Sequence, residues 1–363
     1  MFSQSTFIDL CESELRLCAL SPGESLVVLS QGDERSDYVN AFMAAGQRLG
    51  ASVMNLRLPY SSSASDGDVG VWTVGNTPLK GNRPAVDVLK AADMVVETLF
   101  LLFSEELTEI QGAGTRILTC IEPVDLLARL FPTDDLRRRT DVASELLSGA
   151  SSLRFTNPAG SDATYSIGYP VKAQYGFVDK PGGWDHWPSG GMVITGGRDD
   201  GVDGRVVVAP GDILLPFKRY VSQPIELTIE AGRITGIEGG VDADLVRQYI
   251  ADFDDPDAYG LSHIGWGMDE RAKWSALATD QRGHGMELRA FAGNVLFSTG
   301  PNELFGGPNH SQCHLDIPMR NCSLFLDDRP VIVDGEIVVD ALRATSPGKT
   351  FADPRPRSLG EVA

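Results

Sequence analysis

The sequence predicts a two-domain α/β protein, with an α/β domain and parallel sheet over residues 1–149 and a β-rich α+β domain over residues 150–363. In the first part, apolar runs of strand length alternate with helical patterns, which is typical of a parallel sheet. From about residue 150, short apolar runs alternate with Gly, Asp and Pro turns instead. A chain of 363 residues also exceeds what a single core usually supports.

The first domain begins with a helical pattern over residues 1–20 and ends with a long helix or pair of helices over residues 124–149. Buried strands are expected at 25–30, 51–58, 93–100 and 115–122, with helices near 32–50 and 85–92. The turn after the first strand contains neither the G-x-G-x-x-G nor the Walker pattern, so we assign no nucleotide.

In the second domain, two hairpins are indicated by the turns Glu230-Ala-Gly-Arg and Val333-Asp-Gly-Glu. Helices are expected at 242–253 and 268–278. The expected strands are 163–167, 192–195, 205–208, 213–215, 225–229, 234–237, 291–297, 322–326 and 331–339. All five histidines of the chain lie in this domain.

Composition excludes several classes of protein. A net charge of −19 argues against nucleic acid or an anionic membrane as partner, because both would be repelled. The amino terminus has no basic region followed by an apolar run, and the apolar stretch at 94–103 is too short to span a bilayer. We therefore expect a cytoplasmic protein. Five scattered cysteines form neither a zinc pattern nor a disulfide framework, which fits a reducing compartment.

The segment 306–318 carries the pair His314 and Asp316. Residues at i and i+2 of an extended chain share one face, so this imidazole and carboxylate can converge on one metal ion. Flanking Gly and Pro residues leave too little room for a helix and favour a short strand or ordered loop. His310 shares that face by its even spacing, as a third ligand or as a neighbour of the site. The alternative for the pair is ordinary hydrogen bonding at the surface.

Three other histidines are candidates. His186 lies between Trp184 and Trp187, in a loop that resembles a wall for a flat ring, or else a structural loop anchored by tryptophan. His263 lies among glycines that permit close backbone approach, as a rigid ligand or as a buried structural residue. His284 is expected to be more exposed and mobile than either.

Two histidines and one carboxylate with open positions are the ligand pattern of non-haem Fe(II) oxygenases. Two neutral imidazoles and one carboxylate leave a ferrous centre with about one net positive charge. An anionic chelate, such as a dihydroxylated aromatic ring, and O₂ can then occupy the open positions. His186, with an ordinary pKa of about 6.5, can shuttle the proton that ring attack requires.

The second half resembles the leucyl aminopeptidase-like superfamily of thermophilic metallo-aminopeptidases. The resemblance rests on Thr156-Asn-Pro-Ala-Gly-Ser-Asp, His263-Ile-Gly-Trp-Gly-Met-Asp and His314-Leu-Asp-Ile-Pro, together with the Trp-Pro-Ser-Gly-Gly segment at 187–191. The chain departs from the peptidases where they carry a metal-binding glutamate, because it has Ser189-Gly-Gly-Met there. A two-metal peptidase site is therefore not expected.

Gly183-Trp-Asp-His-Trp-Pro-Ser-Gly and Cys313-His-Leu-Asp carry a closer resemblance, to the 2,5-dihydroxypyridine 5,6-dioxygenases of nicotinate and hydroxypyridine breakdown. The resemblance implies Fe²⁺ held by His263, His314 and Asp316, with His186 at the substrate pocket. It also implies that both atoms of O₂ enter across the C5–C6 bond of an aromatic N-heterocycle, giving N-formylmaleamate.

On this reading the second domain is metal-binding, His186 is catalytic, and the substrate contacts are Trp184, Trp187 and His310. We also expect a homo-oligomer. Two alternatives are a metallo-aminopeptidase-like hydrolase and a non-catalytic small-molecule binder on the same scaffold.

Overall fold

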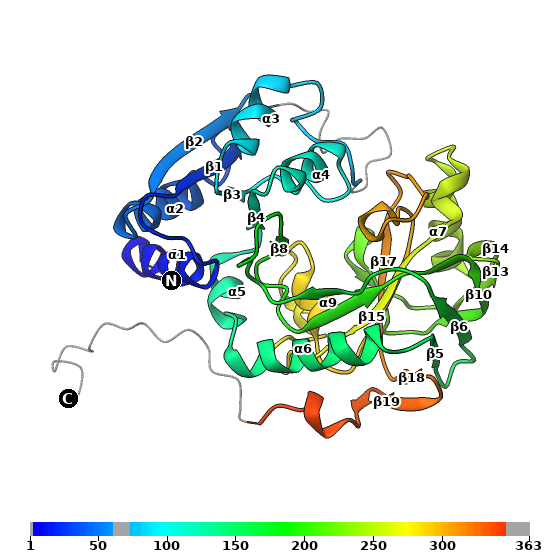
Figure 1. Ribbon diagram of the computed structural model, residues 1–363. Helices are drawn as coiled ribbons and strands as arrows, with labels where there is room; N and C mark the ends of the chain where they lie inside the picture. Colours follow the sequence, from blue (N-terminus) through cyan, green and yellow to red (C-terminus); the bar gives the residue numbers. More distant parts are fainter. Residues whose placement is uncertain (1–2, 61–72, 346–363) are drawn as a thin grey trace.

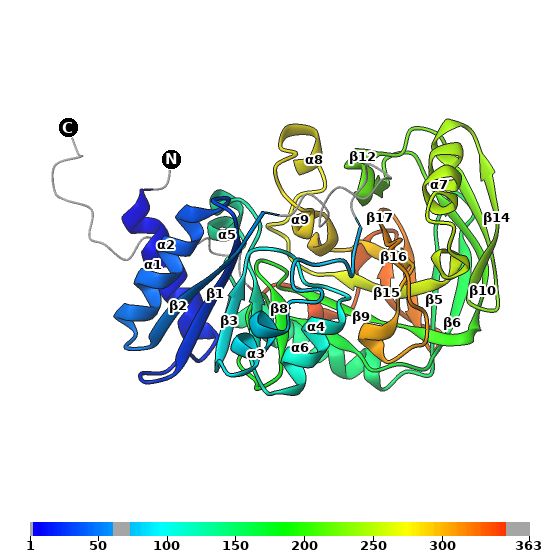
Figure 2. The same cartoon turned by 90° about the horizontal axis from the view of Figure 1, so that it is seen from above.

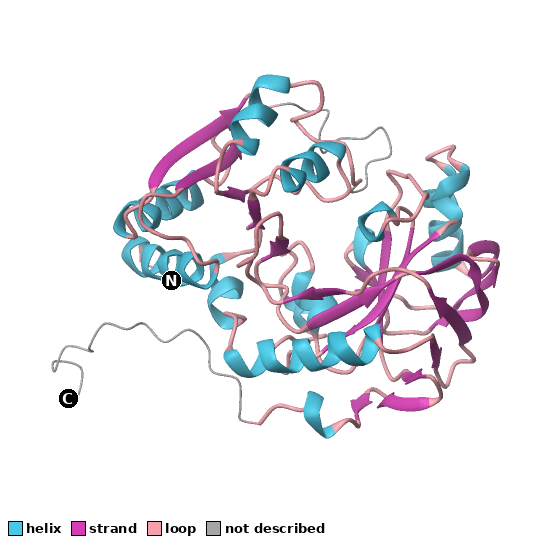
Figure 3. Cartoon of the chain, viewed as in Figure 1, coloured by secondary structure: helices cyan, strands magenta, loops and turns pink. Residues whose placement is uncertain are grey.

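A computed structural model describes residues 3–60 and 73–345. Figure 1 shows a helix-rich unit built mainly from the first part of the chain, beside a unit of antiparallel sheets. Figure 2 shows the same two units side by side from above, and Figure 3 shows that strands dominate the second. The predicted fold class, a parallel-sheet α/β unit followed by a β-rich unit, is confirmed.

The first unit is a five-stranded parallel sheet with helices on both faces. Along β1, alternate residues pack against different helices, because successive strand side chains point to opposite faces. The sheet order is β2 (Ser52–Leu58), β1 (Ser25–Gln31), β3 (Met94–Glu97), β4 (Arg116–Thr119) and β8 (Trp184–His186). One face is covered by α1 (Gln4–Leu17) and α2 (Ser36–Arg48), the other by α3 (Arg83–Lys90) and α4 (Glu105–Gly112).

Strand β8 comes from beyond residue 150, so the first sheet draws its last strand from the second predicted domain. It pairs in parallel with β4, with His186 opposite Thr119. The segment between the units is the expected pair of helices, α5 (Val124–Arg129) and α6 (Asp134–Ser148). The chain therefore crosses back into the first unit after it has begun the second.

The second unit contains two large antiparallel sheets that share one apolar core. The larger has the order β14 (Arg233–Gly239), β13 (Ile225–Glu230), β10 (Gly197–Val208), β6 (Asp162–Ile167), β5 (Ser152–Thr156), β18 (Ser323–Leu326), β19 (Arg329–Val333) and β20 (Glu336–Ile337). The other, which we call the site sheet, has the order β17 (Leu315–Met319), β16 (Val295–Thr299), β15 (Leu261–Gly267), β9 (Met192–Thr195) and β7 (Lys172–Gln174).

Alternation along the site sheet separates its two faces. Ile264, Phe297 and Ile317 belong to the core shared with the larger sheet, whereas Ile194 and Leu296 pack in a separate cluster on the other face. Because His263 and Asp316 adjoin core-facing residues in the sequence, they point to this second face. Smaller elements of the unit are β11 (Ile213–Leu214), β12 (Arg219–Tyr220), α7 (Val241–Ala251), α8 (Ala276–Thr279) and α9 (Met286–Ala290).

Both predicted hairpin turns are confirmed. Ala231 and Gly232 have φ of 47° and 74°, and Asp334 and Gly335 have φ of 49° and 85°, the left-handed pairs that such tight turns need.

The helix predicted at 268–278 is wrong except for α8. Asp269 instead exchanges backbone hydrogen bonds with residues 290 and 292, so this segment pairs with another part of the chain. In the described ranges, no helix is long and apolar enough to cross a membrane.

Candidate active site

The structure brings His263, His314 and Asp316 together on the second face of the site sheet. His263 lies on the central strand β15, whereas His314 directly precedes β17 and Asp316 is the second residue of that strand, two strands away. All three side chains are buried, and their candidate ligand atoms lie within 4.8 Å of one another. Asp316 Oδ1 is 3.4 Å from His263 Nε2 and 3.3 Å from His314 Nε2. We call these three residues the triad.

The donor atoms of the triad fit a cation. His314 Nδ1 lies 3.1 Å from the carbonyl oxygen of Thr299, an acceptor only, so Nδ1 carries a proton and Nε2 is the nitrogen left to bind a metal ion. Nε2 faces Asp316 Oδ1, which has no hydrogen-bond partner among the described residues. A buried carboxylate oxygen that faces two imidazole rings without a hydrogen bond is unfavourable unless a positive charge lies among them.

Protonation at the triad also fits metal binding. Burial lowers the pKa of His263 to about 3, although Asp316 acts in the opposite direction. Burial alone would raise the pKa of Asp316, but His314 and the Arg289 guanidinium hold it well below its usual range. At neutral pH His263 is therefore neutral and Asp316 ionised, the states in which these groups bind metals.

Arg289 is a site residue that sequence reasoning did not find. Its Nε donates to Asp316 Oδ2 at 2.6 Å, which leaves Oδ1 for the cation. Arg289 lies on α9. Its backbone carbonyl oxygen accepts a hydrogen bond of 2.7 Å from Nδ2 of Asn294, which follows the helix. The start of α9 is tied to the first unit, because the Glu122 carboxylate accepts from the N–H groups of His284 and Met286 at 2.8 and 3.0 Å. Sequence reasoning missed Arg289 because its partner Asp316 lies 27 residues away in the chain, and no short motif indicates such a contact.

A cavity lies over the triad, between the two units. Side chains from the first sheet and its loops form one wall, and the site sheet with α9 forms the other. Besides the triad and Arg289 it is lined by Phe100, Leu102, Phe103, Gln174, Trp184, His186, Met192, Ile194, Met286, Leu296 and Leu304. The lining is mostly apolar and aromatic, with a few polar groups near the triad, as is usual for sites that bind small ring compounds.

His186 lines this cavity at the carboxyl end of β8, where ligands of parallel sheets commonly bind. Its Nε2 has no hydrogen-bond partner within the described part of the chain. Burial, and then the positive charges of Arg289 and Arg35 and the nearby His284, place the pKa of His186 well below its usual value. The imidazole is therefore neutral and able to accept a proton.

The two tryptophans beside His186 lie in different parts of the structure. Trp184 lines the cavity, and its Nε1 donates to Thr119 Oγ1 at 2.9 Å. Trp187 does not line the cavity but is fully buried in the core of the first unit, where its ring centroid lies 6.4 Å from that of Phe42 and 6.0 Å from that of Phe131. The predicted pocket role of Trp187 therefore needs correction. Strand alternation is the reason, because Trp184 and His186 share one face of β8 and Trp187 follows on the other.

His310 also lies away from the triad, contrary to the expectation from its spacing. Its side chain is 73% exposed and forms an ion pair with Glu303. The even-spacing argument fails because β17 begins only at Leu315, and the chain before it is irregular. His284, expected to be exposed, is instead half-buried, and its Nε2 accepts from Arg35 Nη2 at 3.0 Å.

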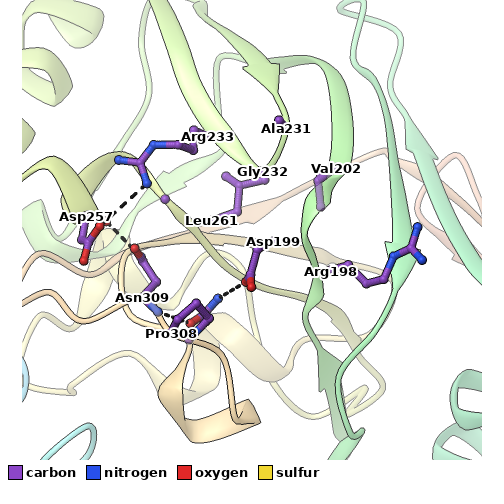
Figure 4. Close-up of a pocket in the computed structure, with 13 residues that line it drawn as sticks. Arg198, Asp199, Val202, Ala231, Gly232, Arg233, Asp257, Leu261, Pro308 and Asn309 are labelled. Carbon is purple, nitrogen blue, oxygen red and sulfur yellow. Dashed lines mark hydrogen bonds and ion pairs between the residues drawn. The ribbon is translucent and has the colours of Figure 1, made fainter.

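A second hollow, shown in Figure 4, lies apart from the triad. Its polar groups largely satisfy one another: Asn302 Nδ2 donates to Asp199 at 3.2 Å, and Arg233 lies 3.8 Å from Asp257. None of the candidate site residues lines it. The chemistry is therefore concentrated in the cavity over the triad.

The fold and site define a two-unit α/β protein with a buried triad of candidate metal ligands under an aromatic-lined cavity. The family model of the 2,5-dihydroxypyridine 5,6-dioxygenases matches residues 6–339. A 2,5-dihydroxypyridine 5,6-dioxygenase from Pseudomonas putida strain KT2440 is 44% identical over 340 residues, which cover 93% of this chain and 97% of that protein. The chain therefore belongs to the 2,5-dihydroxypyridine 5,6-dioxygenase family, and it is an enzyme of the ring-cleaving dioxygenase class.

Solved structures agree with this assignment. A structure of the dioxygenase from Pseudomonas putida KT2440 superimposes with a TM-score of 0.90 at 43% identity, covering 94% of this chain and all of that one. The aminopeptidase AmpT from Thermus thermophilus gives a TM-score of 0.61 at 13% identity, over 92% of this chain and 99% of its own. This second likeness shows a shared fold. The hydrolase alternative is not favoured.

Proposed function

We propose that the enzyme is an Fe(II)-dependent dioxygenase that cleaves the ring of 2,5-dihydroxypyridine or a close analogue between C5 and C6, giving N-formylmaleamate. The observation that carries this proposal is Asp316 Oδ1, which has no hydrogen-bond partner within residues 3–60 and 73–345 and faces two imidazoles beneath an aromatic-lined cavity. Family membership supports the substrate, since the 44% identical relative is named for it. Both oxygen atoms of O₂ remain in the product, so the reaction needs no other reductant.

His263, His314 and Asp316 would hold the ferrous ion. A bound ferrous ion supplies open positions for O₂ and a ring oxygen, together with the redox chemistry that O₂ requires. The protein contributes the surroundings of these groups. Arg289 keeps Asp316 ionised and oriented, and the apolar lining excludes water from the reacting ring.

His186 would act as the acid/base group. Its Nε2 is buried and has no hydrogen-bond partner in the part of the chain that the structure describes, and the ring lines the same cavity as the triad. A neutral imidazole can take the proton of a ring hydroxyl as the substrate binds, and can return it later in the reaction. Trp184 and Phe100 offer flat surfaces for the ring on this side of the cavity.

Oxygen uptake tests the proposal directly. Aerobic protein with 2,5-dihydroxypyridine should consume one O₂ per ring, stop when the iron is chelated, and recover with ferrous salt. With ¹⁸O₂, the product should carry two labelled atoms. Peptide cleavage without O₂ uptake, or binding of 2,5-dihydroxypyridine without turnover, would contradict the proposal.

The ligand assignment has a matched pair of variants. His314→Ala should abolish iron binding and activity and leave a folded protein, whereas His310→Ala should keep both because His310 is exposed and away from the triad. Stoichiometric iron in His314→Ala would refute the assignment.

We further propose that the enzyme is a cytoplasmic homo-oligomer acting in nicotinate or hydroxypyridine breakdown. Its five cysteines, all free and buried, support a reducing compartment. Light scattering of the purified protein tests the oligomer, and a monomer at micromolar concentration would refute it.

A further inference from the structure

Glu97 is the last residue of β3 and is fully buried, but it does not line the cavity. The chain that follows it, residues 98–104, supplies Phe100, Leu102 and Phe103 to the cavity wall. We call these residues the aromatic loop. It connects the parallel sheet to α4 and faces the triad from the side of the first unit.

The Glu97 carboxylate is the acceptor for much of this loop. Its Oε2 accepts from the N–H groups of Leu99 and Phe100, each at 2.7 Å. Its Oε1 accepts from the N–H of Leu101 at 3.2 Å and from the Thr119 hydroxyl. Three successive backbone donors and one hydroxyl therefore converge on a single buried carboxylate, and charge-assisted bonds of this kind are the stronger hydrogen bonds of proteins.

The loop needs this restraint because its backbone is unusual. Phe100 and Phe103 have φ of 72° and 60°, in the left-handed region that bulky side chains rarely adopt. These conformations direct both rings into the site. The Phe100 ring lies 6.0 Å from that of His186, and the Phe103 ring lies 4.9 Å from that of His314.

The same carboxylate also reaches Trp184. Thr119 donates its hydroxyl proton to Glu97 and accepts from Trp184 Nε1 at 2.9 Å, so the indole is oriented through one intermediate group. Strands β3, β4 and β8, which carry these residues, are neighbours in the parallel sheet. One buried group thus holds the backbone of Phe100 directly and the indole of Trp184 through Thr119, and both of these side chains line the cavity.

We propose that Glu97 is a positioning residue for the substrate ring, setting the shape of the aromatic wall through the aromatic loop and through Thr119 and Trp184. It touches neither substrate nor metal, so it acts on ring binding rather than on the reacting atoms. The identity of the ring rests on the proposed function above, whereas the positioning of the loop does not.

Glu97→Gln is the informative substitution because it keeps the size of the side chain. The amide has only one acceptor oxygen, and its NH₂ group would face donors that now meet a carboxylate oxygen. Asp242→Asn is the matched control. Asp242 is also buried and accepts from the N–H groups of Ser222 and Gln223 at 2.7 and 2.9 Å, but it lies outside the cavity lining.

The experiment compares wild type, Glu97→Gln and Asp242→Asn as iron-loaded protein with 2,5-dihydroxypyridine. In Glu97→Gln the KM should rise about tenfold, with kcat and bound iron within about twofold of wild type. Hydrogen–deuterium exchange of residues 98–104 should become about tenfold faster in this variant alone. Asp242→Asn should show wild-type KM and wild-type exchange in the loop.

An unchanged KM in Glu97→Gln, an equal rise in Asp242→Asn, or unaltered exchange in residues 98–104 would each overturn the proposal. Absence of turnover by the wild type would instead refute the proposed function. In that case the exchange measurement still decides whether Glu97 holds the aromatic loop.

Discussion

Replacing Arg289 by methionine should make metal binding weaker and more dependent on pH. Arg289 Nε and Asp316 Oδ2 are 2.6 Å apart, and the two side chains are only 8% and 3% exposed. Leaving one charge of a buried pair without its partner costs about 3–5 kcal/mol. At about 1.4 kcal/mol per factor of ten, Asp316 would bind a proton about 10²–10⁴-fold more tightly than in the wild type.

Metal must then displace that proton. In the wild type, Arg289 and His314 hold the pKa of Asp316 well below its usual range, so the carboxylate is free at pH 6 and at pH 8. We therefore expect the metal affinity of Arg289→Met, relative to that of the wild type, to fall as the pH is lowered. Below the raised pKa of Asp316 in the variant, this relative affinity should approach a tenfold decrease for each pH unit. Competition against a metal-binding dye, with ferrous iron under anaerobic conditions, measures this ratio.

Arg129→Met supplies the control, because Arg129 pairs with buried Glu287 at 2.6 Å without touching the triad. It should lower the free energy of unfolding but leave metal affinity unchanged. Wild-type affinity in Arg289→Met with a flat pH dependence would refute the reasoning that Arg289 keeps Asp316 ready for the metal.

Three further substitutions concern His186 in the cavity, His284 beside Arg35 and Trp187 in the core of the first unit. His186→Gln should lower kcat about 10²–10⁴-fold with normal iron content, and unchanged kcat would exclude an acid/base role. Burial, and then Arg35, lower the pKa of His284 in the folded protein to about 3. In the unfolded chain His284 binds a proton near pH 6.5, whereas in the folded protein it stays neutral, so the folded state loses stability as the pH falls below 6.5. Between pH 6.5 and 5, urea unfolding should show about 2 kcal/mol more loss in wild type than in His284→Gln. Trp187→Ala should lower the free energy of unfolding by about 3–5 kcal/mol, with KM unchanged in the folded fraction; a raised KM would place Trp187 at the pocket after all.

Local chemistry was sufficient for much of the fold. Apolar runs in alternation with helical patterns predicted the parallel sheet, and Ala231-Gly and Asp334-Gly predicted both hairpins, because these signals act over a few residues. The pair His314 and Asp316 could also be recognised from the sequence, because residues two apart in an extended chain point to the same side. The third member, His263, was one of several candidate histidines in the sequence, and only the family resemblance selected it. Spacing along the chain does not show that β15 and β17 lie on either side of β16.

Tertiary structure decided the rest. The return of β8 to the first sheet placed His186 in the cavity and put Trp187 into the core, a division that depends on which strand pairs with β4. The roles of Arg289 and Glu97 could not be predicted from the sequence. Arg289 acts through Asp316, which is distant in the chain, and Glu97 acts largely through backbone N–H groups, which every residue except proline has. By itself the sequence determined which residues could bind a metal ion and a ring. The packing of two units determined which of them meet, because burial and convergence are properties of the folded chain.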